Sequence, residues 1–362
     1  MKTLIFVLLS WPVATFAQLT PVYSTDSKEW VYKAYVANFS GNNNVEIGLG
    51  VGNFDKAQLV FIDANSKQEL AKIPAPVSNP QDRHLCDTDG NGVYELLHVT
   101  PGIEGPGPHW DKVGFTLYEI KDNILTEEAN TEFHGVWADI GDLNGDGNDE
   151  IVLSTMPEGG TEFSGDGPWD IIVLSREGTG FRRIANVTLP TTHMITSVAD
   201  LDGDGKAELI ILRSGYFSRD SVTNEQIPHL SVYSYEDEST LRLVDEVQIP
   251  MERKGNLGLL WIQPLEQNRH RIVIPIPVPY VPGTEDSAID RYQGFQLEGG
   301  QLSAELEPLS FKWETYLSAP WKLDLFTTVE TSGDLPPDSF QLVNRRQLFL
   351  NGGLPPALPK RR

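Results

Sequence analysis

Three short stretches of the sequence share one pattern of acids and glycines, and no other feature restricts the fold as strongly. They are DTDGNGVYEL, DLNGDGNDEI and DLDGDGKAEL, which begin at Asp87, Asp142 and Asp200. In each, oxygen-bearing side chains stand at positions 1, 3 and 5, Gly at position 6 and Glu at position 9, and an apolar run follows. Crowded carboxylates repel one another, so the pattern predicts a bound cation in each loop.

The first half of each stretch matches an EF-hand calcium loop, in which acids at 1, 3 and 5 precede a Gly at 6. The second half differs, because Glu stands at 9 rather than 12 and the residues after it favour a strand over a helix. Ca²⁺ takes about six to eight oxygen ligands, which each stretch supplies if the carbonyl of position 7 is included. A single copy would fit an ordinary Asx/Gly turn, but three identically spaced copies favour metal sites.

The predicted ligands therefore form three sets, for about three Ca²⁺ ions. Val93, Asn148 and Lys206 contribute their backbone carbonyls. We expect the third set to bind most tightly, because it has four carboxylates and the others have three. The sets are Asp87, Asp89, Asn91, Val93 and Glu95; Asp142, Asn144, Asp146, Asn148 and Glu150; and Asp200, Asp202, Asp204, Lys206 and Glu208.

The spacing of these loops continues before the first stretch and after the third, but the side chains at the ligand positions differ there. Glu95, Glu150 and Glu208 stand 55 and 58 residues apart, and Glu46 lies 49 residues before Glu95. Positions 1, 3 and 5 before Glu46 are neutral, so we expect weak or no calcium binding there. Beyond Glu208, the frame reaches Arg271, whose guanidinium should replace the ion, with Glu266 as a partner.

Each period also contains β-rich segments. In the third they are 134–140, 150–155, 170–176 and 181–188. Four antiparallel strands in every 50 to 60 residues are typical of a propeller blade. Helical periodicity is absent nearly throughout. The predicted fold is an all-β β-propeller of about six four-stranded blades, or seven if residues 19–30 complete a further one.

The loops and the strands after them resemble FG-GAP/VCBS repeats, the blades of integrin-alpha-type β-propellers. The resemblance is specific over residues 80–215 and degenerate over 30–80 and 255–310. It implies that each calcium loop joins the first and second strands of its blade. It also implies a scaffold for recognition or adhesion.

Residues 1–17 have the pattern of a signal peptide, with Lys2, an apolar run and a small-x-small site ending at Ala17. We therefore expect a secreted or periplasmic bacterial protein, with a propeller over 18–350 and a disordered tail over 351–362.

The formal net charge of −23 argues against nucleic acid and anionic membranes as partners. No later run is long enough to insert into a membrane. The single cysteine, Cys86, excludes an internal disulfide, and a monomer is expected.

Long loops between the second and third strands should cover the face opposite the calcium loops, and long loops in compact domains are often functional. Two functions remain open: a non-enzymatic protein that binds a glycan or protein there, which we favour, and a polysaccharide lyase. For the lyase, a base and a cation could come from His134, His193, Tyr216, Arg213 and Arg219. The candidate ligand-binding residues on this face are His109, Trp110, His134, Trp169, His193, Tyr216 and His229.

Overall fold

The computed structural model of the chain describes residues 19–24, 30–42, 44–53, 56–75, 83–101, 113–121, 124–133, 137–155, 169–189, 194–213, 228–237, 239–249, 260–265, 269–276, 291–305, 323–324, 339–343 and 347–351. All regular secondary structure in these ranges is β-strand. No helix with the length and hydropathy needed to cross a membrane is found in them. The expected signal peptide and the expected tail after Asn351 lie outside these ranges.

Five groups of four consecutive antiparallel strands, called sheets below, make up most of the described fold; the third and fourth are joined into one eight-stranded sheet, and a short fifth strand adds to the first. The first has β2 (Trp30–Ala37), β3 (Glu46–Asn53), β4 (Lys56–Asp63) and β5 (Glu69–Ala75). The second has β6 (Arg83–Cys86), β7 (Glu95–Pro101), β8 (Val113–Lys121) and β9 (Ile124–Phe133). The third has β10 (Trp137–Gly141), β11 (Glu150–Thr155), β12 (Trp169–Glu177) and β13 (Gly180–Leu189). The fourth has β14 (Met194–Ala199), β15 (Glu208–Arg213), β16 (His229–Asp237) and β17 (Ser239–Gln248). The fifth has β18 (Trp261–Pro264), β19 (His270–Ile276), β20 (Arg291–Glu298) and β21 (Gln301–Ala304).

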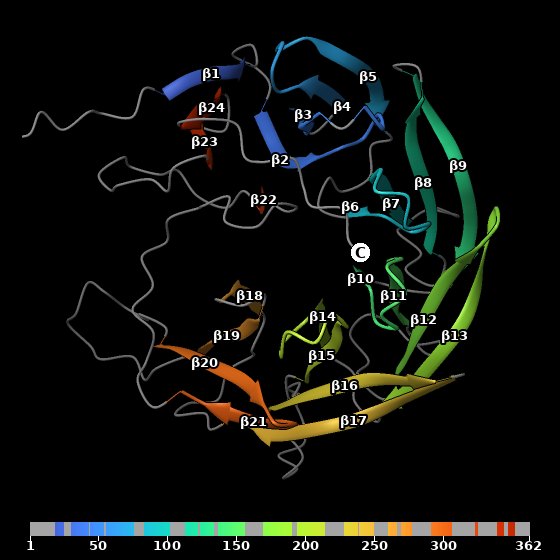
Figure 1. Ribbon diagram of the computed structural model, residues 1–362, viewed down its shortest axis with the longest axis vertical. Coiled ribbons are helices and arrows are strands. Elements are labelled where there is room, and N and C mark those ends of the chain that lie inside the picture. The colour runs from blue at the N-terminus through green and yellow to red at the C-terminus, as the bar shows by residue number, and fades with distance from the viewer. Residues whose placement is uncertain are drawn as a thin grey trace, which may run out of the picture.

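These sheets stand around a common centre (Figure 1), with β6, β10, β14 and β18 on the inside and β9, β13, β17 and β21 on the outside. A short parallel pairing of β13 with β17 joins the third and fourth sheets. The arrangement is propeller-like, and it confirms the predicted all-β class. The predicted segments 150–155, 170–176 and 181–188 lie within β11, β12 and β13, and β10 covers residues 137–140 of the predicted segment 134–140.

The two ends of the described chain meet in one further sheet. β1 (Leu19–Ser24) pairs antiparallel with β24 (Gln347–Asn351), which also pairs with β23 (Ser339–Val343). A two-residue strand, β22 (Leu323–Asp324), lies beside β2. Because this last sheet has three strands in the described residues, the number of blades stays a prediction.

The core lies between neighbouring sheets. Cys86, Leu97 and Leu117 of the second sheet pack against Ile151 and Leu174 of the third. Strands in the middle of a blade are covered on both faces, so β15 is a continuous apolar run after Glu208 and is buried along nearly its whole length. Outer strands such as β13 contain both exposed and buried residues instead.

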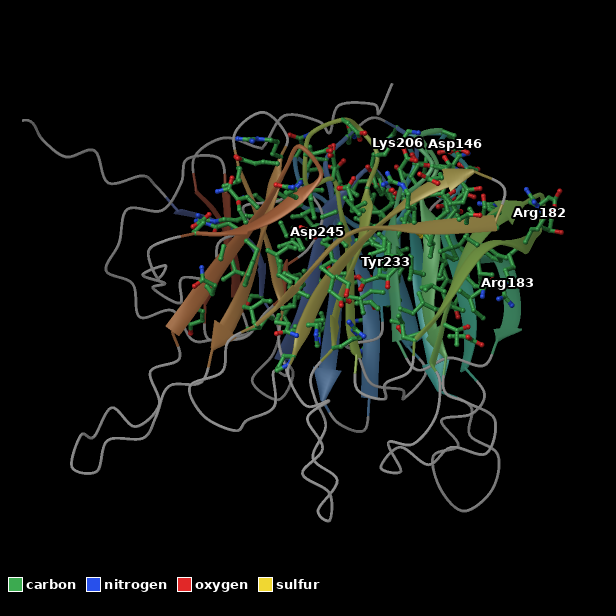
Figure 2. All side chains as sticks on the ribbon, turned by 90° about the horizontal axis from the view of Figure 1, so that it is seen from below. Asp146, Arg182, Arg183, Lys206, Tyr233 and Asp245 are labelled. Atoms are coloured by element: carbon green, nitrogen blue, oxygen red, sulfur yellow. The ribbon has the colours of Figure 1, made fainter. Side chains whose placement is uncertain are left out.

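The acidic loops join the inner strand of a sheet to the second strand, as the FG-GAP/VCBS resemblance implied. They connect β6 to β7, β10 to β11 and β14 to β15. Asp146 and Lys206, from two different loops, lie together at one end of the molecule (Figure 2). The second strand of each sheet runs away from its loop, which puts Arg213, the last residue of β15, toward the opposite end.

Candidate metal centre

Each acidic loop is closed by its position-9 glutamate, which accepts a hydrogen bond from the backbone N–H of position 2. This holds even for the neutral first copy, and the four glutamates are almost wholly buried. The bonds run from Phe39 to Glu46 (2.7 Å), Thr88 to Glu95 (2.9 Å), Leu143 to Glu150 (2.9 Å) and Leu201 to Glu208 (2.8 Å).

The acid at position 1 holds the turn in the same way, because one of its oxygens accepts the N–H of the position-6 glycine. Side chains at positions 3 and 5 likewise accept amides two residues further on, as Asx turns do. Groups of the chain itself therefore hold the turn of each loop. The position-1 bonds run from Gly92 to Asp87 (2.9 Å), Gly147 to Asp142 (3.0 Å) and Gly205 to Asp200 (3.0 Å).

Neighbouring loops are also hydrogen-bonded to each other in a repeated way, and we call this chain of loops the loop belt (residues 38–46, 87–95, 142–150, 200–208 and 263–271). The carbonyl oxygen of position 1 accepts a hydrogen bond from position 8 of the next loop. In the last link, His270 reaches Asp200 through its ring nitrogen Nδ1 (2.7 Å). The backbone links run from Tyr94 to Asn38 (2.8 Å), Asp149 to Asp87 (2.8 Å) and Ala207 to Asp142 (2.7 Å).

Position 7 adds a second link, which the sequence interpretation missed. We expected only its carbonyl to matter, but its side chain lies over the position-4 glycine of the preceding loop. Val93 lies over Gly41, Asn148 over Gly90 and Lys206 over Gly145. These three glycines also have φ values of 68° to 79°, in the left-handed region that side chains disfavour.

The surroundings of the position-9 glutamates are unfavourable for their ionised forms. Burial, with a contribution from the aspartates of the same loop, raises the pKa of Glu95, Glu150 and Glu208 to about 8. Burial also raises the pKa of Asp87 to about 6. Amide donors oppose these shifts but do not cancel them. A cation placed among these carboxylates would favour their ionised form.

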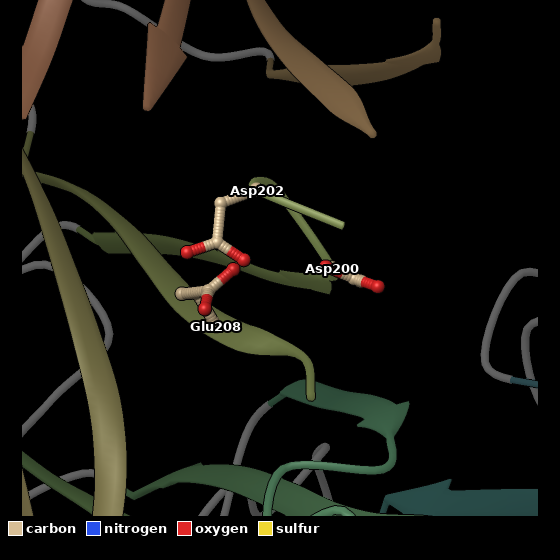
Figure 3. Close-up of side chains that lie close together, drawn as sticks. All are labelled: Asp200, Asp202 and Glu208. Atoms are coloured by element: carbon tan, nitrogen blue, oxygen red, sulfur yellow. The ribbon is translucent and has the colours of Figure 1, made fainter. Parts of the chain in front are cut away.

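The 200–208 loop comes nearest to an assembled cation site. Asp200, Asp202 and Glu208 each offer one oxygen, and these atoms lie within 4.8 Å of one another. Figure 3 shows the carboxylates of Asp202 and Glu208 facing each other, with Asp200 beside them. Asp204 is outside this group, and its Oδ1 accepts the N–H of Lys206 (2.8 Å). Carboxylate oxygens are the hard donors that Ca²⁺ prefers, so this donor set fits the ion.

The 142–150 loop separates its acids with an amide. Nδ2 of Asn144 donates to Oδ2 of Asp146 (3.0 Å) and to Oε1 of Glu150 (2.9 Å). The amide thus supplies hydrogen-bond donors between two carboxylates. If the amide were rotated so that Oδ1 of Asn144 faced these two carboxylates, that oxygen would be the predicted ligand.

The 87–95 loop contains a buried oxygen without a hydrogen-bond partner, Oδ1 of Asp87. A buried polar atom of this kind is costly, and a cation would satisfy it. The same loop is contacted by Arg176 of β12, whose Nη1 lies 3.0 Å from Oε1 of Glu95.

The loop before Arg271 has the predicted cation but a different partner. Nε of Arg271 donates to Oε1 of Gln263 at position 1 (2.9 Å), and Nη1 donates to both oxygens of Glu305 (2.9 and 3.0 Å). Glu305, which follows β21, was not identified from the sequence, and Glu266 lies outside the described residues. The guanidinium therefore bonds a side chain of its loop, as an ion would.

Few of the predicted ligand-binding residues on the opposite face lie in the described ranges. Trp169 begins β12 and His229 begins β16, where it pairs in register with Arg213. The guanidinium of Arg213 is ion-paired with Glu246, which also accepts the hydroxyl of Ser231 (2.6 Å). His109, Trp110, His134, His193 and Tyr216 lie outside the described ranges, as does Arg219.

Comparisons with known proteins match these features. The family model of the FG-GAP-like repeat matches residues 142–211, which confirms the resemblance that the acidic loops predicted. Over 173 residues the chain is 27% identical to the rhamnogalacturonan endolyase YesW of Bacillus subtilis (strain 168). That alignment covers 43% of this chain and spans only 26% of the length of the curated relative.

Two solved structures are similar at low sequence identity. The crystal structure of rhamnogalacturonan lyase YesW is 14% identical with a TM-score of 0.38, over 80% of this chain and 67% of that chain. The crystal structure of the exotype rhamnogalacturonan lyase YesX is 10% identical with a TM-score of 0.43, over 94% of this chain and 76% of that chain.

Proposed function

We propose that the chain is a calcium-stabilised β-propeller that binds an acidic plant-type polysaccharide, of the rhamnogalacturonan class, on the face opposite the loop belt. The observation that carries this proposal is the 27% identity over 173 residues to a rhamnogalacturonan endolyase. It favours a glycan over a protein as the ligand. The net charge of −23 requires that cationic side chains on the binding face offset the general repulsion of an acidic polymer.

Binding is favoured over cleavage by the state of Arg213. A lyase needs a base to remove the proton beside the uronate carboxylate, and a cation to neutralise that carboxylate as charge develops. Arg213 was a candidate cation, but Glu246 already neutralises it. His229 pairs with Arg213 between β15 and β16. The positive charge beside His229 is therefore already neutralised by Glu246.

Cleavage of the same polymer is the second candidate, and it is favoured because the similar protein is an endolyase. In that case β-elimination would leave an unsaturated uronate at the new chain end. His134, His193, Tyr216 and Arg219 are the residues that would supply the base and the cation.

Calcium in the acidic loops is the cofactor of this proposal, about three ions at saturation. Asp200, Asp202 and Glu208 would hold one, and the matching positions of the other two loops would hold the rest. The ion supplies positive charge to buried carboxylates whose pKa is otherwise raised. The support is the converging oxygens and the unpartnered Oδ1 of Asp87.

The proposal includes an exported, monomeric protein. The support for export is the signal-peptide pattern of residues 1–17. Size-exclusion chromatography with light scattering measures the oligomeric state, and N-terminal sequencing of protein recovered outside the cytoplasm identifies the cleavage site.

One experiment separates binding from cleavage. Purified protein in millimolar Ca²⁺ is run through native gels that contain rhamnogalacturonan, homogalacturonan or a neutral glucan, and the same polymers are assayed for new unsaturated uronate by ultraviolet absorbance. We expect retardation in rhamnogalacturonan alone and no rise in absorbance. A rise in absorbance establishes the lyase, and no retardation in any polymer overturns the glycan proposal.

A further inference from the structure

The side chain of Arg176 comes from the third sheet and reaches the acidic loop of the second. Its Nη1 donates to Oε1 of Glu95 (3.0 Å) and to Oγ1 of Thr88 (3.1 Å), and it lies 3.8 Å from Oδ2 of Asp89. The side chains of Arg176 and Glu95 are only 9% and 1% exposed. The ion pair is therefore largely shielded from water and salt.

The fold places Arg176 there through the alternation of its strand. Leu174, two residues earlier on the same face of β12, packs against Cys86 and Leu97 of the second sheet. Arg176 continues that face to the end of the strand, where the 87–95 loop begins. Nε of Arg176 also donates to the carbonyl of Gly178 (3.2 Å), which fixes its direction.

The other four described sheets have no cationic residue at this position. Leu174 pairs with Ile151, and the equivalent residues by register are Ile62, Tyr118, Tyr233 and Phe295. Two residues beyond these stand Ala64, Ile120, Tyr235 and Leu297. Among the five described sheets, an arginine therefore stands at this position in one, and the other four have apolar or aromatic residues there.

The three acidic loops thus differ in what already stands among their carboxylates. The 200–208 loop has three oxygens within 4.8 Å of one another, and the 142–150 loop has the neutral amide of Asn144. The 87–95 loop has a full positive charge bonded to its position-9 glutamate. Both oxygens of Glu95 are engaged, since Oε2 accepts the N–H of Thr88 (2.9 Å).

We propose that Arg176 is the built-in counter-cation of the 87–95 loop, so that this loop keeps its shape without a metal ion and binds Ca²⁺ more weakly than the 200–208 loop. The second half of this statement rests on the proposed calcium function, and the first half does not. Arg176 covers the side of Glu95 and Asp89. It leaves Oδ1 of Asp87 without a partner, so a weak site remains.

The first test uses no calcium. Melting temperatures are measured in EDTA for the wild type, Arg176→Gln, Glu95→Gln and the double variant. We expect Arg176→Gln to lower the melting temperature, and to lower it less when Glu95→Gln is also present, because the charge it neutralises is then absent. The matched control is Arg182→Gln in the next strand, whose pair with Glu177 is exposed and should matter little. Equal losses in both backgrounds overturn the counter-cation.

The second test counts and ranks the calcium sites by titration calorimetry. In the wild type, Asp89→Asn should remove the weakest binding step. In Arg176→Gln, that step should strengthen about tenfold, because a cation beside the ligands has been replaced by a neutral group. Arg176→Lys keeps the charge and should bind like the wild type. If Arg176→Gln leaves every step unchanged, the weak-site half of the proposal is wrong.

The outcome of each test can be interpreted without the other. If no variant binds Ca²⁺, the proposed calcium function is wrong, while the coupling in EDTA still decides the role of Arg176. If Arg176→Gln unfolds in EDTA but regains its fold in Ca²⁺, the ion has replaced the guanidinium and the proposal is supported. If it stays unfolded in both, while Arg176→Lys folds as the wild type does, the requirement for a cation at this position is upheld.

Discussion

The side chain of Lys206 lies across Gly145 of the preceding acidic loop, so closely that a Cβ on Gly145 would stand 2.8 Å from Cγ of Lys206. The backbone repeats this link, because the N–H of Ala207 donates to the carbonyl of Asp142 (2.7 Å). Two consecutive loops therefore fit into each other. Glycine at position 4 is required by the neighbouring loop as well as by its own backbone.

This contact predicts that Gly145→Ala destabilises the protein more than Gly147→Ala does. Both glycines have positive φ, 79° and 91°, so both variants bear a backbone cost of about 1–2 kcal/mol. Only Gly145 has Lys206 against it, since nothing lies within 4 Å of a Cβ at Gly147. Urea unfolding measures the difference. Adding Lys206→Ala should recover the extra loss of Gly145→Ala, and a double variant as unstable as the single one would contradict the contact.

Asp202→Asn should lower the melting temperature in millimolar Ca²⁺ more than Asp146→Asn does. Asp202 belongs to the converging group, whereas Asp146 already shares the amide of Asn144. An ion that binds only the folded state stabilises it by about 2.7 kcal/mol at 100-fold excess over the dissociation constant. In EDTA the difference should shrink, because no ion then binds to either loop and each variant removes a charge that repels the glutamate of its own loop. Equal losses in calcium would show that convergence of oxygens does not rank these sites.

Glu305→Gln should destabilise the fifth sheet at neutral pH and lose its effect in acid. Burial raises the pKa of Glu305, but hydrogen bonds from Gln296 and Arg271 and the charge of Arg271 outweigh it, so the pKa is lowered from its ordinary 4.5. A group with a lowered folded-state pKa stabilises the fold above its ordinary pKa, and this stabilisation is lost as the pH falls through the folded-state value. The measurement is the difference in melting temperature from the wild type between pH 7 and pH 3. The difference should not depend on Ca²⁺, because Arg271 occupies position 9 of this loop, where the acidic loops have Glu.

Leu174→Ala should cost about 2–5 kcal/mol of unfolding free energy, the usual range for a leucine deleted from a packed core. Leu174 is fully buried between the second and third sheets. Leu243→Ala is the matched control, since Leu243 is 45% exposed on β17 and its loss should cost about 0.5 kcal/mol or less. Similar costs for the two variants would mean that neighbouring blades do not form the core together.

The strands and the acidic loops could be predicted because their signals are local. Position 9 and position 2 of one loop are seven residues apart, as Glu208 and Leu201 are, and the apolar run after Glu208 follows directly in the chain. Contacts between blades could not be predicted in this way. Arg176 meets Thr88 across 88 residues, and Arg271 meets Glu305 across 34. Each depends on how two sheets pack, which no single stretch of sequence records.

The contact made by the side chain at position 7 could not be predicted either, although it joins two neighbouring loops. The side chains of Val93, Asn148 and Lys206 are chemically unlike one another, so no pattern among them predicted that they occupy equivalent places. What they share is the glycine beneath them. The signal was present at position 4, where Gly41, Gly90 and Gly145 recur, but it belongs to the loop before.

The pairing of β1 with β24 also sets an order in time. A growing chain presents Leu19 long before Asn351, and the five four-strand sheets can form as they are made because their strands are consecutive. The sheet that holds β1 has to wait for the last strand to be synthesised. Until then β1 is an open strand edge, which other extended chains can pair with. Loss of the segment from Gln347 onward, by a protease or a premature stop, would therefore leave the N-terminal strand exposed to aggregation.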